Sequence, residues 1–202
     1  MPTNLVFVFQ KPKLLRYTDV LVRINVNKKY FIAIVLPPPV IDEVEELKNE
    51  LFTNYNLKGG LGSPAHITLH RPFEWKEINE LKLIETLKIF SFKNTFAIHL
   101  KNYNFFEPRV VYVDVEKNES LTELQTQLKL FAQKKLKLLN EVNDLRGFKP
   151  HVTIAFRDLK KPLFYELQNQ FKNKEYASSF NYGGFSLLKF DKKWEVIHNF
   201  LI

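Results

Sequence analysis

The chain has 202 residues, of which 45% are hydrophobic and 26% are charged, and its formal net charge is +8. This composition excludes a disordered or fibrous chain and indicates one globular domain or two small lobes. The absence of cysteine excludes disulfides, thiolate metal sites and a cysteine nucleophile. We expect a cytoplasmic protein without a signal peptide or a membrane segment, because no apolar run approaches the roughly 20 residues that a membrane span needs.

The first elements can be predicted in chain order. Residues 1–26 carry no recognisable motif, so we predict an N-terminal extension of unknown role, followed by one bilobal domain over residues 27–202. Residues 28–36 predict a strand, which three prolines end. Residues 40–55 predict a helix, because apolar residues recur there at helical spacing. Two adjacent glycines and a proline make residues 57–64 a loop.

The remaining elements nearly repeat this order. We predict strands at 65–70, 95–106, 109–116, 150–156, 184–190 and 194–202, and helices at 75–90, 120–139 and around 163–171. The helix at 120–139 is the clearest, because Ser120 and Glu123 fit a capping box and leucines line one face. The near-repeat predicts an α+β fold of two similar lobes, each an antiparallel sheet backed by helices.

Two short motifs, "AHITLH" at 65–70 and "PHVTIAF" at 150–156, place a histidine and a threonine two positions apart in separate strands. Side chains alternate along a strand, so His66 and Thr68 share one face, about 6.6 Å apart along the strand. His151 and Thr153 do the same in the second motif. The alternation also predicts that His70 lies on the face of His66. The remaining histidines of the chain, at positions 99 and 198, have no such partner, and we predict structural roles for them.

Two histidines and two threonines across a cleft suit the chemistry of a phosphodiester. One neutral imidazole can accept a proton while the other, protonated, delivers one to a leaving oxygen. Threonine hydroxyls can donate to non-bridging phosphate oxygens. A metal site is disfavoured, because His66 and His70 lie about 13 Å apart on one strand and neither motif contains a carboxylate. We therefore predict no metal and no cofactor.

The paired motifs "HITL" and "HVTI" resemble those of the two-histidine (2H) phosphoesterase superfamily, in particular its bacterial 2'-5' RNA ligase-like branch of RNA 2',3'-cyclic phosphodiesterases. "YFIAIVLPPPV", "FFEPRVVYVDVE" and "FKPHVTI" support this resemblance over roughly residues 28 to 200. It implies a bilobal fold, with two antiparallel sheets in a pseudo-twofold arrangement around a central groove. It also implies that His66 and His151 are catalytic and that Thr68 and Thr153 bind phosphate. By the same analogy, His151 activates water and His66 protonates the departing ribose oxygen.

The chain departs from this pattern after the second motif. Many relatives carry an arginine five positions after the second histidine, where this chain has Phe156; Arg157 follows, and the alternation predicts that it lies on the other strand face. Further side chains are candidates for phosphate contact or base stacking. These candidates are His70, Arg71, Phe148, Tyr30, Phe73 and Phe106.

Together these features predict a metal-independent enzyme that opens 2',3'-cyclic phosphates of RNA ends or nucleotides to 2'-phosphates, with reversible 2'-5' ligation as a second activity. The positive net charge agrees with such an anionic partner. One alternative is a 2H hydrolase that acts on another small phosphodiester. A second is an RNA- or nucleotide-binding module without turnover, and a third is a structural protein whose basic surface binds a partner.

Overall fold

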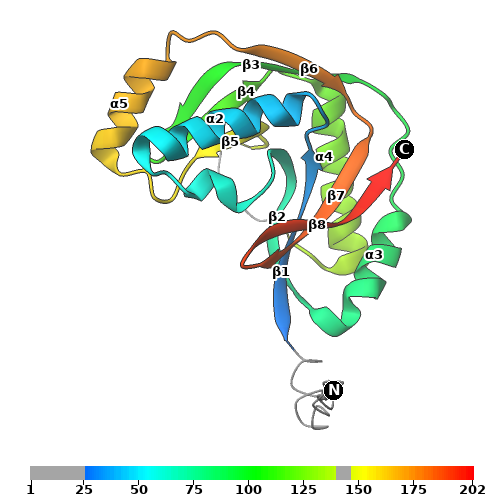
Figure 1. The fold of residues 1–202 in the computed structure, drawn as a ribbon. Helices are drawn as coiled ribbons and strands as arrows, with labels where there is room; N and C mark the ends of the chain where they lie inside the picture. Colours follow the sequence, from blue (N-terminus) through cyan, green and yellow to red (C-terminus); the bar gives the residue numbers. More distant parts are fainter. Residues whose placement is uncertain (1–25, 140–146) are drawn as a thin grey trace, which may run out of the picture.

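The computed structural model describes residues 26–139 and 147–202, in which eight strands form a single sheet (Figure 1). The predicted extension over residues 1–26 lies outside this range except for its last residue. The strands are β1 (Asn27–Val35), β2 (His66–Lys76), β3 (Ala97–Phe106), β4 (Val110–Val115), β5 (His151–Ala155), β6 (Ala177–Asn181), β7 (Gly184–Asp191) and β8 (Lys193–Leu201). The helices are α2 (Val40–Tyr55), α3 (Glu80–Lys88), α4 (Glu119–Phe131) and α5 (Lys161–Phe171), with short turns η1 (Gly59–Gly62), η2 (Glu77–Asn79) and the π-helical η3 (Ala132–Leu136).

The sheet has the order β6-β3-β4-β5-β2-β1-β7-β8, and every neighbouring pair is antiparallel. The two strands that carry the His/Thr motifs, β2 and β5, are the central pair, and Ile67 lies opposite Val152. This pair divides the sheet into a His66 half (β2, β1, β7 and β8) and a His151 half (β5, β4, β3 and β6). The predicted α+β class is confirmed, and the two expected sheets are the halves of one continuous sheet.

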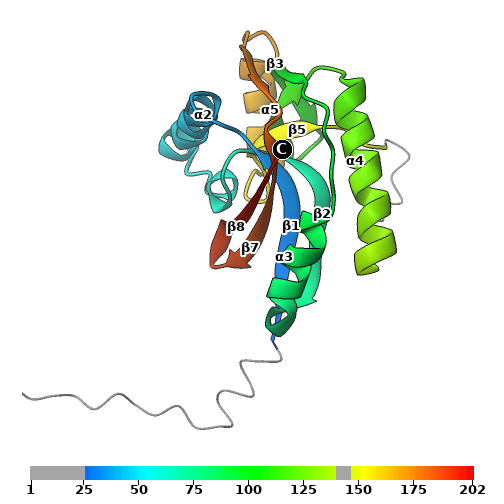
Figure 2. The same cartoon turned by 90° about the vertical axis from the view of Figure 1, so that its right-hand side faces the viewer.

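The helices connect the two halves. The helix α2 follows β1 of the His66 half but packs on β5, whereas α4 follows β4 of the His151 half but packs on β2. Figure 2 shows α2 on one side of the strands and α4 on the other. One hydrophobic cluster includes Ile32 of β1, Val113 of β4 and Phe164 of α5. The core therefore runs through both halves.

Local sequence explains most of these elements. In α4 and η3, Leu121, Leu124, Leu128, Ala132 and Leu136 are all buried, which confirms the predicted apolar face. The predicted capping box is wrong. The helix begins one residue earlier, and the side-chain oxygen of Asn118 accepts a 2.9 Å hydrogen bond from the Leu121 amide. Asparagine is as good an N-cap as serine, and here it caps the Leu121 amide in place of the Glu123 amide that Ser120 would have capped.

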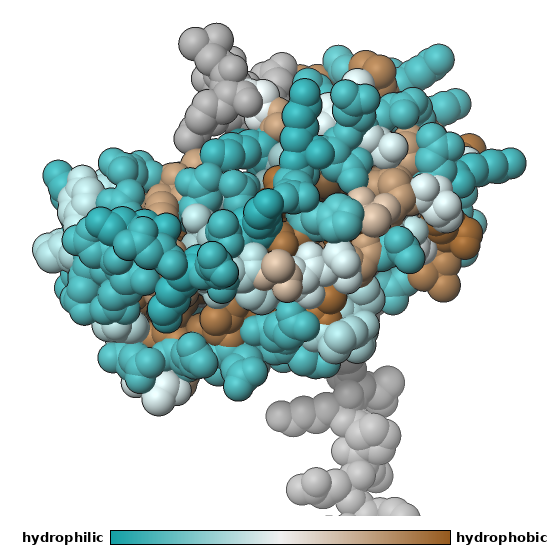
Figure 3. All heavy atoms as spheres, turned by 90° about the horizontal axis from the view of Figure 1, so that it is seen from above, coloured by the Kyte–Doolittle hydropathy of each residue, from teal (hydrophilic) through white to brown (hydrophobic). Residues whose placement is uncertain are grey.

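The strand β6 was not predicted. Its sequence, "ASSFN", is short and polar, and only Phe180 is buried. It forms an edge of the sheet and pairs with β3 alone. The outer surface is mostly hydrophilic when viewed from above (Figure 3). Among the described residues, no helix is long and apolar enough to cross a membrane.

Candidate active site

The two His/Thr motifs lie side by side at the centre of the sheet. When the register is continued by one residue on either side of the Ile67–Val152 pair, His66 lies opposite Thr153 and Thr68 opposite His151. Ile67 and Val152 are fully buried, whereas the two histidines and two threonines are half-buried on the opposite face. Directly opposed side chains have Cβ atoms about 5 Å apart. Each histidine is therefore next to the threonine of the other motif.

The same backbone contact holds each imidazole. The Nδ1 atom of His66 lies 2.6 Å from the Pro64 carbonyl oxygen, and Nδ1 of His151 lies 2.8 Å from the Lys149 carbonyl oxygen. A carbonyl can only accept, so Nδ1 carries the proton and donates in both rings. The Nε2 atom is then the nitrogen that can exchange a proton with a substrate. This arrangement supplies two oriented proton-transfer groups.

Aromatic rings surround both histidines. The Phe31 ring lies 4.8 Å from the His66 ring and packs edge-on against Trp194 at 4.6 Å. The His151 ring lies 4.9 Å from Phe106 and 5.0 Å from Tyr112. Burial in these surroundings disfavours the charged imidazolium, and it lowers the pKa of His66 to about 4 and also lowers the pKa of His151.

The charged neighbours of the two histidines differ. On β4, Asp114 is the register partner of His151, and its carboxylate raises the His151 pKa, opposing the larger effect of burial. On β1, Val35 is the register partner of His66 and offers no charge. The ammonium of Lys48 lowers the His66 pKa further. The Lys149 and Arg71 charges also lower the His151 pKa, each by less than Asp114 raises it, whereas no carboxylate raises the His66 pKa. The site therefore stabilises a proton on His151 better than on His66.

A cavity of about 180 Å³ opens beside the first motif. Its lining combines the histidine and threonines of the motifs with aromatic and loop residues. The lining residues are Phe31, Gly60, Ser63, His66, Thr68, Pro72, Thr153, Phe156, Arg157 and Trp194. Sequence reasoning did not identify Phe31, Trp194 or Ser63 as site residues, because they come from other strands and from the loop after η1.

Arg157 lies at this cavity, on the face of His151 and Thr153 where the alternation places it, whereas Phe156, which the alternation places in the core, lines the cavity as well. The strand β5 ends at Ala155, and Arg157 adopts a left-handed conformation with φ +63°. This turn breaks the alternation of the strand, so Phe156 and Arg157 both line the cavity. The guanidinium carbon of Arg157 lies 4.9 Å from the centre of the Phe156 ring. The cavity therefore has a cationic side chain, one position later in the sequence than the arginine that the resemblance leads us to expect.

The loop η1 is fixed against the end of β5. The carboxylate of Asp158 accepts hydrogen bonds from the Lys58 and Gly59 amides, at 2.6 Å and 3.0 Å. A Cβ atom at Gly59 would lie 2.1 Å from the Phe156 carbonyl oxygen, and one at Gly60 would lie 2.3 Å from that of Ile154. The two glycines are therefore required for this approach, which forms one wall of the cavity.

The alternation-based placement of His70 on the face of His66 is wrong. A bulge in the pairing of β1 with β2, between Ala33–Thr68 and Ile32–His70, shifts the alternation by one residue. His70 is 1% exposed, and its ring packs edge-on against Phe73 at 5.3 Å. Its Nδ1 atom lies 2.9 Å from the Arg71 carbonyl oxygen. The structure therefore places this histidine in the core.

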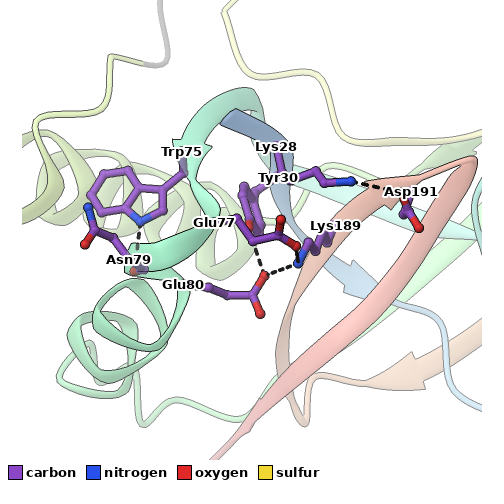
Figure 4. A network of polar contacts seen from close by, with 8 residues as sticks. All are labelled: Lys28, Tyr30, Trp75, Glu77, Asn79, Glu80, Lys189 and Asp191. Atoms are coloured by element: carbon purple, nitrogen blue, oxygen red, sulfur yellow. Dashed lines mark hydrogen bonds and ion pairs between the residues drawn. The ribbon is translucent and has the colours of Figure 1, made fainter. Parts of the chain in front are cut away.

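Tyr30 also lies away from the motifs. It is fully buried, and its hydroxyl donates a 2.8 Å hydrogen bond to the Glu80 carboxylate, which also contacts Lys189 (Figure 4). Lys189 forms a second ion pair with Glu77 at 2.6 Å. This network ties β1 and β7 to the segment before α3, which is a structural role.

Two further predicted contacts have different positions. Phe148 is half-buried and packs against the hydrophobic core. Arg71 is exposed, and its charge lies near enough to lower the His151 pKa. Arg71 is therefore the one of these two that lies at the second motif. Among the described residues, no group of three or more His, Cys, Asp or Glu side chains is placed to hold a metal ion.

Known proteins resemble this chain in sequence or in fold. A protein of Bacillus pumilus named as a phosphoesterase is 31% identical over 96 residues, which cover 46% of this chain and 52% of that protein. The chain thus spans about half the length of this curated relative. The crystal structure of TT0787 of Thermus thermophilus has a TM-score of 0.58 and 21% identity, covering 86% of this chain and 97% of the other.

The crystal structure of Escherichia coli LigT complexed with 3'-AMP has a TM-score of 0.58 and 17% identity, with 87% of this chain and 98% of LigT covered. At these identities the two crystal structures establish the fold alone. The family model described as the 2'-5' RNA ligase superfamily matches residues 36–194, a range that contains both His/Thr motifs. The resemblance inferred from the motifs is therefore confirmed, and the chain belongs to the 2'-5' RNA ligase superfamily.

Proposed function

We propose that this protein hydrolyses 2',3'-cyclic phosphates, at RNA ends or on nucleotides, to 2'-phosphates without a metal ion. The observation that carries the proposal is the pair of imidazoles, each with Nδ1 donating to a backbone carbonyl and each next to a threonine of the other strand. Two such imidazoles can provide a general base and a general acid for the same displacement at phosphorus.

The reaction needs one proton removed and one delivered. A base takes a proton from water, whose oxygen forms a bond to phosphorus as the bond from phosphorus to the ribose 3' oxygen breaks. An acid protonates that departing oxygen, which leaves a 2'-phosphate and a 3' hydroxyl. Thr68 and Thr153 would donate to the non-bridging oxygens, where negative charge increases in the transition state. When the 5' hydroxyl of a second RNA attacks phosphorus in place of water and the same bond to the 3' oxygen breaks, the product is the 2'-5' linkage expected from the family.

The surroundings of the histidines support His66 as the base and His151 as the acid. His66 is kept neutral by burial and by the Lys48 charge, whereas the Asp114 carboxylate favours a proton on His151. This assignment is the reverse of the one implied by the resemblance. The phosphate of a bound substrate would add negative charge and would raise the proton affinity of both rings.

The cavity beside His66 supports a nucleotide substrate. Phe31, Trp194 and Phe156 offer aromatic faces for a base, and Arg157 offers a charge for a phosphate. The related fold of LigT has been crystallised with 3'-AMP and also with phosphate. We propose a terminal nucleotide of RNA as the group bound here, and a cytoplasmic location stays a prediction.

The test is cleavage of a short RNA that ends in a 2',3'-cyclic phosphate, in excess EDTA. The wild type should open the cyclic end, and His66→Ala and His151→Ala should each lose about a hundredfold to ten-thousandfold in rate. His99→Ala is the matched control, because His99 is an exposed strand histidine outside the motifs and should leave the rate unchanged. Loss of wild-type activity in EDTA would contradict the proposed absence of a metal.

The same assay separates the alternatives. Wild-type protein that binds this RNA and leaves the cyclic end intact would favour the binding module without turnover. Hydrolysis of other small phosphodiesters, but not of cyclic ends, would favour a different substrate for the same four residues. Both results would overturn the cyclic phosphodiesterase.

A further inference from the structure

Lys48 is a buried charge that the proposed reaction does not use. It lies on α2 and is 2% exposed, although lysine is rarely buried without a partner. Its Nζ atom donates to the Glu45 carboxylate at 2.8 Å and to the Ser63 carbonyl oxygen at 3.0 Å. Removing this charge from water costs free energy. Packing of the apolar stem alone therefore does not explain why the ammonium group of Lys48 is buried.

The ion pair holds the segment immediately before the first motif. Glu45 accepts a 2.6 Å hydrogen bond from the Ala65 amide through the same carboxylate oxygen that contacts Lys48. Lys48 and Glu45 therefore bind the residue before Pro64 and the residue after it. The Pro64 carbonyl oxygen, between these two anchors, accepts the hydrogen bond from Nδ1 of His66.

We propose that the Glu45–Lys48 ion pair is a positioning device for His66, which fixes the carbonyl that orients the imidazole and places a positive charge behind the ring. The inference rests on the proposed function for its catalytic meaning, because it makes these two residues part of the support of the general base. Neither side chain is a catalytic residue, since the carbonyl of Pro64 and the ring of His66 separate them from the substrate.

The charges around His66 support this role. Burial is the largest cause of its lowered pKa, and the Lys48 and His151 charges lower that pKa further, whereas the hydrogen bond to the Pro64 carbonyl raises it. The neighbouring strand β1 adds no charge, because it presents Phe31 and Val35 to this histidine. Lys48 thus opposes protonation of this ring from behind, and Arg157 lines the cavity on its open side. Burial lowers the pKa of Lys48 itself, and the ion pair with Glu45 opposes that effect.

The loop η1 lies against the stem of Lys48. Gly60 is buried, and a Cβ atom there would lie 3.6 Å from Cγ of Lys48 and 2.3 Å from the Ile154 carbonyl oxygen. The absence of a side chain at this position lets the loop lie directly over the lysine stem. Burial of Lys48 and the shape of the cavity wall therefore depend on the same glycine.

The experiment is an NMR titration of the His66 ring in the full chain, which needs no catalysis. Lys48→Met keeps the apolar stem and removes the charge. It should raise the pH at which His66 titrates by about one unit. The double variant Glu45→Gln with Lys48→Met retains an acceptor for the Ala65 amide and should raise the midpoint in the same direction. It serves as the second test if the single variant folds poorly.

Lys88→Met is the matched control. The Glu85–Lys88 pair on α3 has the same i,i+3 spacing and the same 2.8 Å distance but is exposed and remote from the motifs. It should leave the His66 midpoint unchanged. Folded Lys48 variants whose His66 midpoint equals that of the wild type would overturn the inference, even if their melting temperatures fell.

The pH dependence of cyclic phosphate hydrolysis then connects the device to the reaction. A base must be unprotonated, so the acidic limb of the rate profile should move to higher pH in both Lys48 variants and not in Lys88→Met. A wild type without activity would contradict the proposed function alone, because the NMR midpoint would still report on the device. A shifted midpoint with an unshifted acidic limb would overturn the role of the device in supporting a base.

Discussion

The two halves of the sheet present the same motif in different electrostatic surroundings. In both, a histidine donates from Nδ1 to the carbonyl two residues earlier and lies next to a threonine from the other strand. In the His151 half the neighbouring strand supplies Asp114, whereas in the His66 half it supplies Val35, with Lys48 behind the ring. The two halves share the hydrogen-bond geometry of the histidine but differ in the charges around it. The two imidazoles can therefore differ in their affinity for a proton.

The largest effect should come from breaking the feature that the halves share. Thr68→Val and Thr153→Val keep the shape of each side chain and remove its hydroxyl. Each should lower the rate of cyclic phosphate hydrolysis by about a hundredfold, because a lost donor to developing charge commonly costs that much. Equal losses, measured by kcat, would support a symmetric phosphate cradle. A loss at only one position would show that one half alone holds the phosphate.

The next largest effect should come from the aromatic rings, whose substitution should have different kinetic consequences in the two halves of the sheet. Phe31 lines the cavity and supports His66, whereas Phe106 packs on His151 and does not line this cavity. Phe31→Leu should raise KM about tenfold, since base stacking is worth about 1–3 kcal/mol per base. Phe106→Leu should change kcat with little change in KM. Tyr30→Phe, at the adjacent core position, is the control. The same KM for all three variants would contradict the proposal that Phe31, and not Phe106, binds the base.

The smallest effect should identify the acid. The Asp114 carboxylate raises the His151 pKa, so Asp114→Asn should lower that pKa. An acid must be protonated, so the basic limb of the pH–rate profile should move to lower pH. Movement of the acidic limb instead would make His151 the base, as the resemblance implies. Asp191→Asn, which removes an exposed carboxylate paired with Lys28, should move neither limb.

The helices and strands could be predicted from the sequence better than the order in which the strands pair. Alternation within one strand correctly paired His66 with Thr68, because both residues lie on the same short segment. The pairing of Thr68 with His151 depends on which strands meet and in what register, and strands distant in sequence carry no local signal for that. The same limit hid Phe31 and Trp194, which reach the cavity from β1 and β8.

Single-residue changes of backbone caused the other differences. The bulge that turns His70 into the core, and the turn at Arg157 that leaves Phe156 at the cavity, each interrupt a period-two pattern at one position. Neither residue is a glycine or proline, so the usual sequence signs of such irregularities are missing. Lys48 was missed for another reason: a lysine is typical of a solvated surface, although this one shares the buried face of α2 with Val44 and Leu51.

The crossed packing of α2 on β5 and α4 on β2 has a consequence for how the chain folds. Contacts between residues distant in sequence form slowly, because the chain entropy of closing a long loop is lost before the contact stabilises it. The central strand pair joins Ile67 to Val152, so the two histidines meet only after both segments have been synthesised and docked. A nascent chain that has released only its first motif therefore holds His66 without His151 and lacks half of the candidate site.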